Sequence, residues 1–315
     1  VFMIEEIITS GRMNPEIDPI LHVWGGEIPF YLFLGGISAG ILIFSAYFTL
    51  RGRQEELPVA VKWMPLAVPF LIGIGLIALL MDLSHVLYFW QLFTNIRWES
   101  PMSWGAWTLG IIMPLSIAWI ATWVEDIFPK WDWKFDEVKT AIEWLKNYRR
   151  YMAQILILLS VILGMYTGIL LSAFNARPFW NTSILGPLFL ASGLSASAAL
   201  VSFFSKSEVE KRLFTRIDII LIGIELFMIV HLFMGHLAGT QVHIQAAQMF
   251  LGGAFTVPFW VFVVGLGLLL PVVLEILELK HKFIPAIVPV VLIVAGNLML
   301  RFIVVNAGQA SRWLY

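Results

Sequence analysis

Eight stretches of this 315-residue chain are long and apolar enough to cross a lipid bilayer, and no other feature constrains the fold as strongly. A helix needs about 20 mainly apolar residues to span the hydrocarbon core of a membrane. By that criterion we predict spanning helices at residues 27–50, 64–90, 104–124, 151–172, 184–204, 217–238, 249–275 and 284–305. Only 13% of the residues are charged, against about 25% in soluble domains. The predicted fold class is all-α, a polytopic membrane protein.

Lysine and arginine are distributed unevenly between the connections of these spans. Fifteen lie in the connections on one side of the membrane, and five lie in the tails, the other connections and the last span. Because basic residues are retained in the cytoplasm, we expect both termini at the opposite face, which is the periplasm for a bacterial inner membrane. Residues 1–8 lack a basic start and a long apolar core, so we expect the spans themselves to direct insertion. The amphipathic stretch Asp136–Tyr148 is expected to lie on the cytoplasmic surface.

Two stretches resemble each other at an offset of about 156 residues: LFLGGISAG at 32–40 and LFLASGLSAS at 188–197. Both belong to spans that enter from the outer face, which indicates a parallel repeat of four helices plus four. Close packing of small residues is the alternative explanation for the likeness. We predict a periplasmic segment at 1–26, a first four-helix bundle at 27–172 and a second at 173–315.

The absence of cysteine excludes several cofactors. A sequence without thiolates holds no iron–sulfur cluster on cysteine, no CxxCH-attached haem and no cysteine-based zinc site. A b-type haem needs two facing histidines, and the only source of such a pair is His85 with His231 or His236. We therefore expect no haem and no metal, and since no basic block is present, no nucleic-acid partner.

Ionisable and phenolic side chains gather near the outer ends of the first four spans: Glu27, Tyr31, Asp82, His85 and Tyr166. Charged groups at membrane depth cost about 2.5–3.5 kcal/mol on insertion scales, so each needs a partner or a purpose. A helical spacing of three would place Asp82 and His85 on one face, where they can share a proton. Such groups suit a quinone, whose carbonyls gain or lose protons with electrons. The alternative is an Asp–His pair that only ties two helices together.

A second polar pattern lies on the sixth span, where Asp218, Glu225 and His236 are 7 and 11 residues apart and share one helix face. This stripe covers about 27 Å, nearly the hydrocarbon thickness, and could relay protons. Alternatively, Glu225 pairs with Arg301 of the last span, while Asp218 and His236 lie in water at the two interfaces.

Several stretches together resemble the NrfD/PsrC family of integral membrane subunits, typified by the membrane anchor of polysulfide reductase. The matching pieces are GEIPFYLFLGGISAG (26–40), DLSHVLYFWQLF (82–93), SPMSWGAW (100–107), YTGILLSA (166–173), RPFWN (177–181), 186–197 and RFIVVNAGQ (301–309). They extend from the first span to the last. The sequence departs from the polysulfide reductase pattern at Tyr31 and Ile28, where that subunit carries histidine and asparagine.

The resemblance implies a module that binds menaquinone or another quinone in the first bundle, near the outer face. Tyr166 matches the family's quinone-contacting tyrosine; Tyr31, Glu27, His85, Trp104 and Arg177 are further expected contacts. Asp82, His85 and Glu27 are the expected proton acceptors. It also implies a periplasmic partner with four iron–sulfur clusters and a molybdenum bis-pterin catalytic subunit, in a complex of anaerobic respiration. A proton- or ion-coupled transporter without redox chemistry is the alternative function.

Overall fold

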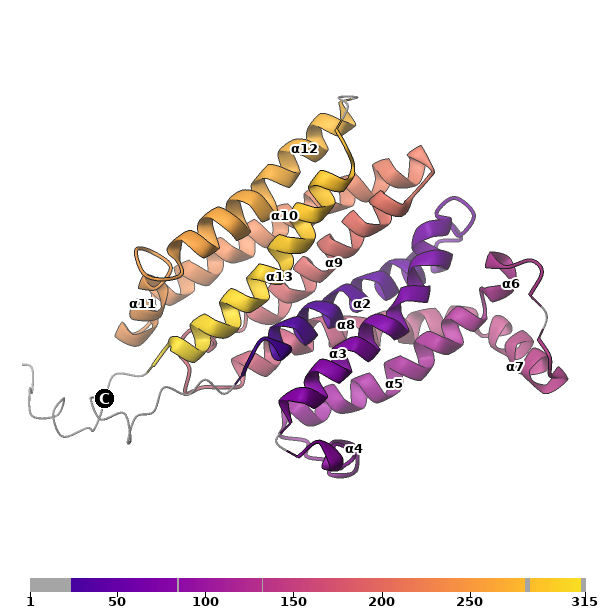
Figure 1. Cartoon of the computed structure of the whole chain (residues 1–315), viewed down its shortest axis with the longest axis horizontal. Helices are drawn as coiled ribbons and strands as arrows, with labels where there is room; N and C mark the ends of the chain where they lie inside the picture. Colours follow the sequence, from indigo (N-terminus) through magenta and orange to yellow (C-terminus); the bar gives the residue numbers. More distant parts are fainter. Residues whose placement is uncertain (1–23, 84, 132, 281–283, 313–315) are drawn as a thin grey trace, which may run out of the picture.

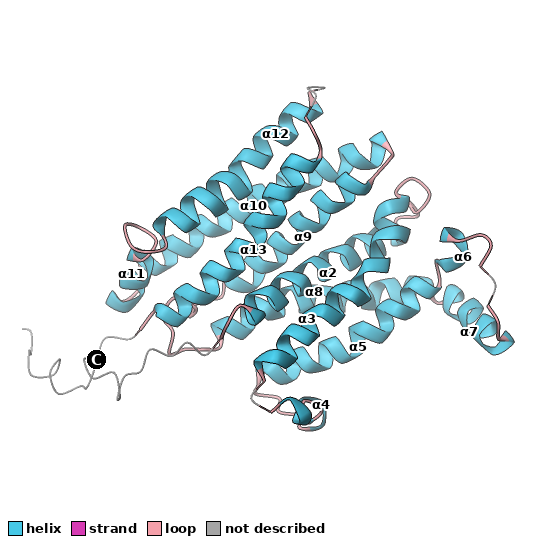
Figure 2. Ribbon diagram, viewed as in Figure 1, coloured by secondary structure: helices cyan, strands magenta, loops and turns pink. Residues whose placement is uncertain are grey.

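The computed structural model describes residues 24–312 apart from 84, 132 and 281–283, and every regular element in that part of the chain is helical (Figure 2). Eight helices there are long and apolar enough to cross a membrane. This confirms the predicted number of spans and the all-α fold class. Residues 1–23 of the predicted N-terminal segment lie outside the described residues.

The spans of the first half are α2 (Glu27–Leu50), the rod η1 (Val59–Trp63), η2 (Met64–Ala67) and α3 (Val68–Asp82), then α5 (Pro101–Ala121) and α8 (Arg149–Ser172). Those of the second half are α9 (Leu185–Phe204), α10 (Glu208–Leu237), the rod η4 (Pro258–Leu269) and α12 (Leu270–Leu279), and α13 (Ile287–Ala310). Short helices in the connections are η3 (Val86–Tyr88), α4 (Gln91–Thr94), α6 (Val124–Ile127), α7 (Asp136–Asn147) and α11 (Gln241–Gln248).

Three predicted boundaries differ from those in the structure by eight or nine residues. The second span ends at Asp82, not at residue 90, because Leu83 is extended with φ −75° and ψ 127°. The sixth begins at Glu208 rather than 217, since acidic groups in a first turn favour the helix dipole. The seventh begins at Pro258 rather than 249, because Gly252 has φ +126°, which only glycine adopts readily. Apolar composition alone does not reveal such breaks.

The long helices lie in two groups of four, α2, α3, α5 and α8 beside α9, α10, α12 and α13 (Figure 1). Equivalent helices make equivalent contacts: the first and second pack together in both groups, as do the third and fourth. The fourth helix of each group also contacts the first helix of the other. This pseudo-twofold pattern supports the interpretation of a parallel repeat.

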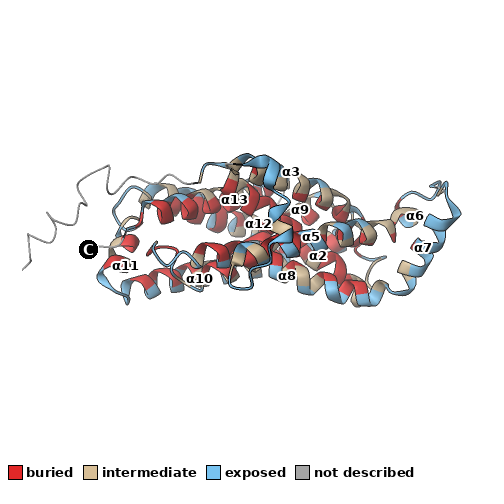
Figure 3. Ribbon diagram, turned by 90° about the horizontal axis from the view of Figure 1, so that it is seen from below, coloured by how far each residue is buried: buried red, intermediate tan, exposed pale blue. Residues whose placement is uncertain are grey.

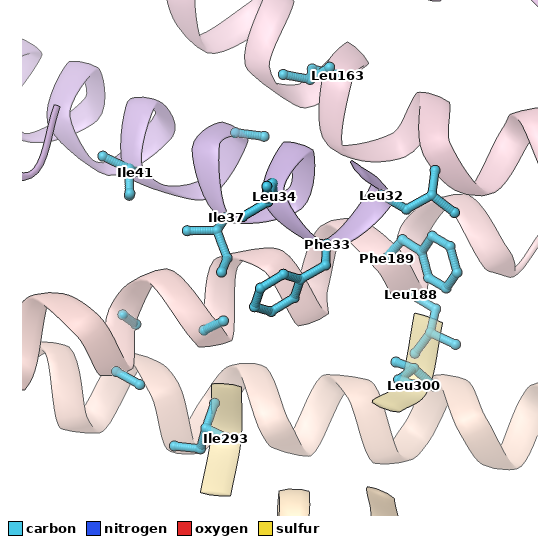
Figure 4. Close-up of a cluster of buried hydrophobic side chains, with 14 of the residues drawn as sticks. Leu32, Phe33, Leu34, Ile37, Ile41, Leu163, Leu188, Phe189, Ile293 and Leu300 are labelled. Carbon is cyan, nitrogen blue, oxygen red and sulfur yellow. The ribbon is translucent and has the colours of Figure 1, made fainter. Parts of the chain in front are cut away.

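The two repeated stretches pack against each other along a seam between α2 and α9. A Cβ atom on Gly193 would lie 2.5 Å from Gly36 O, so side chains are excluded at this crossing. The single hydroxyl hydrogen of Ser197 is shared between two carbonyl oxygens, Ile37 O across the seam (2.9 Å from Oγ) and Gly193 O of its own helix (2.7 Å). Beside the seam, apolar side chains of both groups interdigitate, among them Phe33 of α2 (Figure 4).

We call the end with Glu27 and Ala310 the terminal end, and the opposite end, which carries the basic connections, the lysine-rich end. At the lysine-rich end α7 projects from the bundle with a largely exposed surface (Figure 3). Lys146 of α7 pairs with Glu125 and lowers the pKa of that carboxyl, and Trp133 Nε1 donates to it (3.2 Å). The predicted amphipathic helix is thus present, and these contacts attach it to the end of α5 and α6.

Candidate functional site

A cavity of about 190 Å³ opens at the terminal end of the first group of helices, between α2, α3, α5 and α8. Apolar side chains form most of its wall. The side chains with polar groups are Trp24, Tyr31, Asp82 and Tyr166. An apolar cavity of about 150 Å³ holds a benzene molecule, so this one has room for a ring-sized ligand.

The two phenols stand in the interior of the cavity. Tyr31 on α2 is 3% exposed and Tyr166 on α8 is 7% exposed, and the two are close enough to interact electrostatically. Within the described residues neither hydroxyl forms a hydrogen bond to the protein. Gly105 on α5 makes room for Tyr166, because a Cβ atom there would overlap the phenol ring. Two phenol hydroxyls therefore line the cavity without protein partners, and both are free to donate a hydrogen bond to a ligand there.

Asp82 lies at the mouth of the cavity. It is half-buried at the C-terminal end of α3, where the helix dipole opposes a negative charge. Glu27, in the first turn of α2, is near enough to raise the energy of a second charge there. Both the dipole of α3 and the carboxyl of Glu27 therefore disfavour an ionised Asp82, which suits a group that binds and releases a proton.

The structure corrects the expected geometry of Asp82 and His85. The spacing of three does not place them on one helix face, because α3 ends at Asp82 and the backbone turns outward at Leu83. His85 is exposed and lines an open, more polar hollow of about 860 Å³ together with Tyr88 and Arg97. This outer hollow shares Leu83, Phe89, Leu92 and Met102 with the cavity, so the two are adjacent.

Two further predicted contacts lie outside the cavity wall. Trp104 is 52% exposed, and its Nε1 donates to Trp98 O (2.8 Å) beside a separate surface hollow. Arg177 donates to the Gln309 carbonyl oxygen (2.8 Å) and so ties the α8–α9 connection to the end of α13.

Sequence reasoning missed Trp24 and the aromatic residues Phe89 and Phe93 as parts of the cavity wall. Trp24 is held in place by Gln309, whose Oε1 accepts from Trp24 N (2.9 Å) and whose Nε2 donates to Trp24 O (3.0 Å). Its ring packs against Trp180 at 5.3 Å between centroids. Phe89 and Phe93 belong to the stretch 82–93, whose apolar character favours a continued helix. The high aromatic content of this stretch was the one sequence signal that could have pointed to a cavity wall.

The second group of helices holds the other predicted polar residues. Asp218, Glu225 and Arg301 are each at most 1% exposed and His236 is 2% exposed. The interpretation that Asp218 and His236 lie in water is therefore wrong. Glu225 and Arg301 are near enough to interact electrostatically. The predicted pairing is not an ion pair in the described part of the chain, because Arg301 donates to Ser192 Oγ (2.6 Å) and Phe189 O (3.0 Å) instead.

The structure does not place His236 beside Asp218 or Glu225. It stacks on Phe179 (5.3 Å) and His243 (5.8 Å) near the terminal end. Eleven residues along α10, about 16 Å, separate it from Glu225, and the buried residues between them are Ile229, Leu232 and Phe233.

Eight helices long and apolar enough to span a membrane, with an apolar, phenol-lined cavity at one end, define a polytopic membrane protein with an interior cavity large enough for a small molecule. The protein belongs to the NrfD family, because the family model described as "Polysulphide reductase, NrfD" matches residues 13–311.

Curated relatives are similar over nearly their whole length. Protein NrfD of Escherichia coli (strain K12) is 31% identical over 306 residues, covering 92% of this protein and 96% of the relative. The C subunit of polysulfide reductase from Wolinella succinogenes is 32% identical over 302 residues, covering 91% and 94%. A Haemophilus influenzae protein named NrfD homolog is 30% identical over 310 residues, covering 92% and 95%.

Proposed function

We propose that this protein is the quinone-binding membrane subunit of a respiratory oxidoreductase complex, with its site in the cavity of the first group of helices. Family membership supports a membrane subunit of such a complex. The observation that carries the quinone assignment is the pair of buried phenols, Tyr31 and Tyr166, with no hydrogen-bond partner among the described residues.

The cavity fits a quinone head group in size and chemistry. Its apolar wall suits a ring, its phenol hydroxyls can donate to ring carbonyl oxygens, and a tail can leave through the open side toward lipid. A bound quinone supplies the two-electron, two-proton chemistry of the site. Menaquinone or another quinone satisfies these requirements.

The residues of the protein divide the remaining work. Tyr166 and Tyr31 orient the ring by donating hydrogen bonds. Asp82, with Glu27 beside it, binds and releases a proton at the mouth. His85 in the outer hollow is the next group that can pass this proton to water. Trp24 closes one side of the cavity, and Gln309 holds it there.

We further propose that the redox partner docks at the terminal end, over the outer hollow. Several large apolar side chains around the hollow are unusually exposed, including Leu87 (85%) and Trp98 (73%). An apolar surface of this kind indicates contact with a partner or with lipid. A periplasmic subunit with four iron–sulfur clusters, joined to a molybdenum bis-pterin subunit, fits this position. The distribution of basic residues supports a bacterial inner membrane with this end in the periplasm.

Closing the cavity tests the proposal. Ala106 lines the cavity from α5, so Ala106→Trp fills the space of the ring. The control is Ile111→Trp on the same helix, at a 47% exposed position. We expect the purified complex to lose bound quinone and quinol-linked electron transfer with Ala106→Trp and to keep both with Ile111→Trp. Viologen-driven activity of the partner subunits should be unchanged in either variant. Normal quinone content in Ala106→Trp, with the complex assembled, would place the quinone elsewhere.

A proton- or ion-coupled transporter is the second candidate, favoured by the buried Asp218, Glu225 and Arg301. The two functions differ in one measurement. Proteoliposomes of the purified protein should take up ions without any electron donor if it is a transporter, and should not if it serves redox chemistry alone.

A further inference from the structure

A cluster of acidic side chains is buried in the second group of helices, apart from the cavity. Asp218 and Glu225 reach it from α10, Glu275 from α12 and Arg301 from α13. None of the four is more than 3% exposed. We call these four residues the acid cluster. Glu275 was not among the candidates from the sequence.

Asp218 and Glu275 lie side by side, carboxyl to carboxyl. Asp218 Oδ2 and Glu275 Oε2 are buried, and neither has a hydrogen-bond partner in the described part of the chain. An ionised carboxylate only accepts hydrogen bonds, so two ionised groups in contact have no donor between them. A proton on one of them supplies that donor and removes the repulsion between like charges.

Glu225 contributes a third carboxyl with an unpartnered oxygen. Ser195 Oγ donates to Asp218 Oδ1 (2.5 Å). Ser192 Oγ accepts from both Arg301 Nη1 (2.6 Å) and Asn297 Nδ2 (2.6 Å). Glu225 Oε1 is buried and has no hydrogen-bond partner in the described part of the chain. An ionised Glu225 would therefore lack a donor at that oxygen, which favours a proton on its carboxyl.

A count of charges also gives two bound protons. The acid cluster contains three carboxyl groups and one guanidinium, all buried, and an uncompensated charge in an apolar interior is expensive. Two protons on the three carboxyls leave one negative charge, which balances Arg301. The nearest other charged pair, Lys211 with Glu278 (2.6 Å), neutralises itself and is partly exposed toward the lysine-rich end.

We propose that Asp218, Glu225 and Glu275 form a proton-binding site that holds two protons against the charge of Arg301 and exchanges them with water at the lysine-rich end. The route to water follows from position, because Glu275 lies three residues before the partly exposed Glu278 on α12. The protons come from water and return to it, and no group in the acid cluster is oxidised or reduced. The proposal does not depend on quinone binding in the first group of helices.

Infrared spectroscopy of the purified full-length protein at neutral pH tests the count, because protonated carboxyls have a separate C=O band that shifts in D₂O. The isosteric variants are Asp218→Asn and Glu275→Gln. Each removes one carboxyl, so charge balance against Arg301 then needs one bound proton instead of two. We expect the protonated-carboxyl band to fall about twofold in each variant. Glu278→Gln is the matched control on the same helix and should leave the band unchanged.

Each outcome bears on the proposal. A wild-type protein without a protonated-carboxyl band at neutral pH would overturn it, whether or not the variants fold. So would an undiminished band in folded Asp218→Asn and Glu275→Gln. Loss of the wild-type band when NaCl is added at constant pH would show that the cluster binds a metal cation in place of the protons.

Discussion

Replacing Tyr166 by phenylalanine should have opposite effects on stability and on quinone affinity. The hydroxyl is buried against the cavity and has no hydrogen-bond partner among the described residues, so removing it leaves no protein group unsatisfied. A fully buried hydroxyl without a partner costs about 1–3 kcal/mol, which is an upper bound for Tyr166 because its side chain lines the cavity. The quinone-free Tyr166→Phe variant should therefore be as stable as the wild type, or more stable by up to about that amount.

The same change should weaken quinone binding. A hydrogen bond to a neutral acceptor contributes about 0.5–1.5 kcal/mol, which corresponds to a roughly 2- to 13-fold increase in Kd. Tyr31→Phe should act similarly. Because the two phenols are neighbours, the double variant need not be additive.

Two assays on the purified protein, stripped of quinone, measure these effects: thermal unfolding without quinone, and titration with a soluble naphthoquinone. Tyr47→Phe is the control, since Tyr47 lies at the other end of α2 and its hydroxyl accepts only an exposed bond from Arg51. A less stable apo Tyr166→Phe would show that the hydroxyl is bonded within the protein. Unchanged quinone affinity in both phenylalanine variants would refute the role of the phenols.

Three further outcomes are expected. Asp82→Asn should slow quinol oxidation about 100-fold or more, which is the contribution of a positioned acid–base group, with little change in the Kd for quinone. His85→Ala, outside the cavity, should slow quinol oxidation less. The reverse order in steady-state assays would make His85 the principal proton acceptor. Arg301→Met should lower the free energy of unfolding by about 3–5 kcal/mol, since it leaves buried carboxyls without their counter-charge; an unchanged unfolding midpoint would contradict this. Lys146 lowers the pKa of Glu125 in the folded protein. The ion pair therefore stabilises the fold at pH values above the pKa that Glu125 has in the unfolded chain. This stabilisation is lost as the pH falls through the lower pKa of the folded state. Lys146→Met should destabilise the protein by at most about 1 kcal/mol at neutral pH and not at strongly acid pH, and an equal loss at both would exclude the ion pair as its cause.

The number of membrane spans could be predicted from the sequence because apolar length is a local property. The spans and the amphipathic helix beginning at Asp136 appear in the structure close to their predicted positions. The end of α3 could not be predicted in this way, because the mostly apolar sequence after Asp82 favours a continued helix, whereas Leu83 is extended and Phe89 lines the cavity. The expected Asp82–His85 face was wrong for the same reason.

Tertiary contacts account for the other residues that sequence reasoning missed. Trp24 lies before the first span and reaches the cavity only through its hydrogen bonds to Gln309, which is 285 positions away. Glu275 is a lone acid in an apolar helix, and its importance follows from the approach of Asp218 on another helix. No local pattern records either contact.

The seam at Gly36 and Gly193 has a mechanical consequence. Carriers that work by alternating access rock one bundle against the other about a central site. Here the two groups of helices are joined at their backbones, and Ser197 donates a hydrogen bond across the joint. Opening this joint would lose the close backbone packing at the glycines and the hydrogen bond from Ser197 Oγ to Ile37 O. We therefore expect the two groups of helices to form a stationary frame, which suits the proposed movement of protons and electrons between fixed groups.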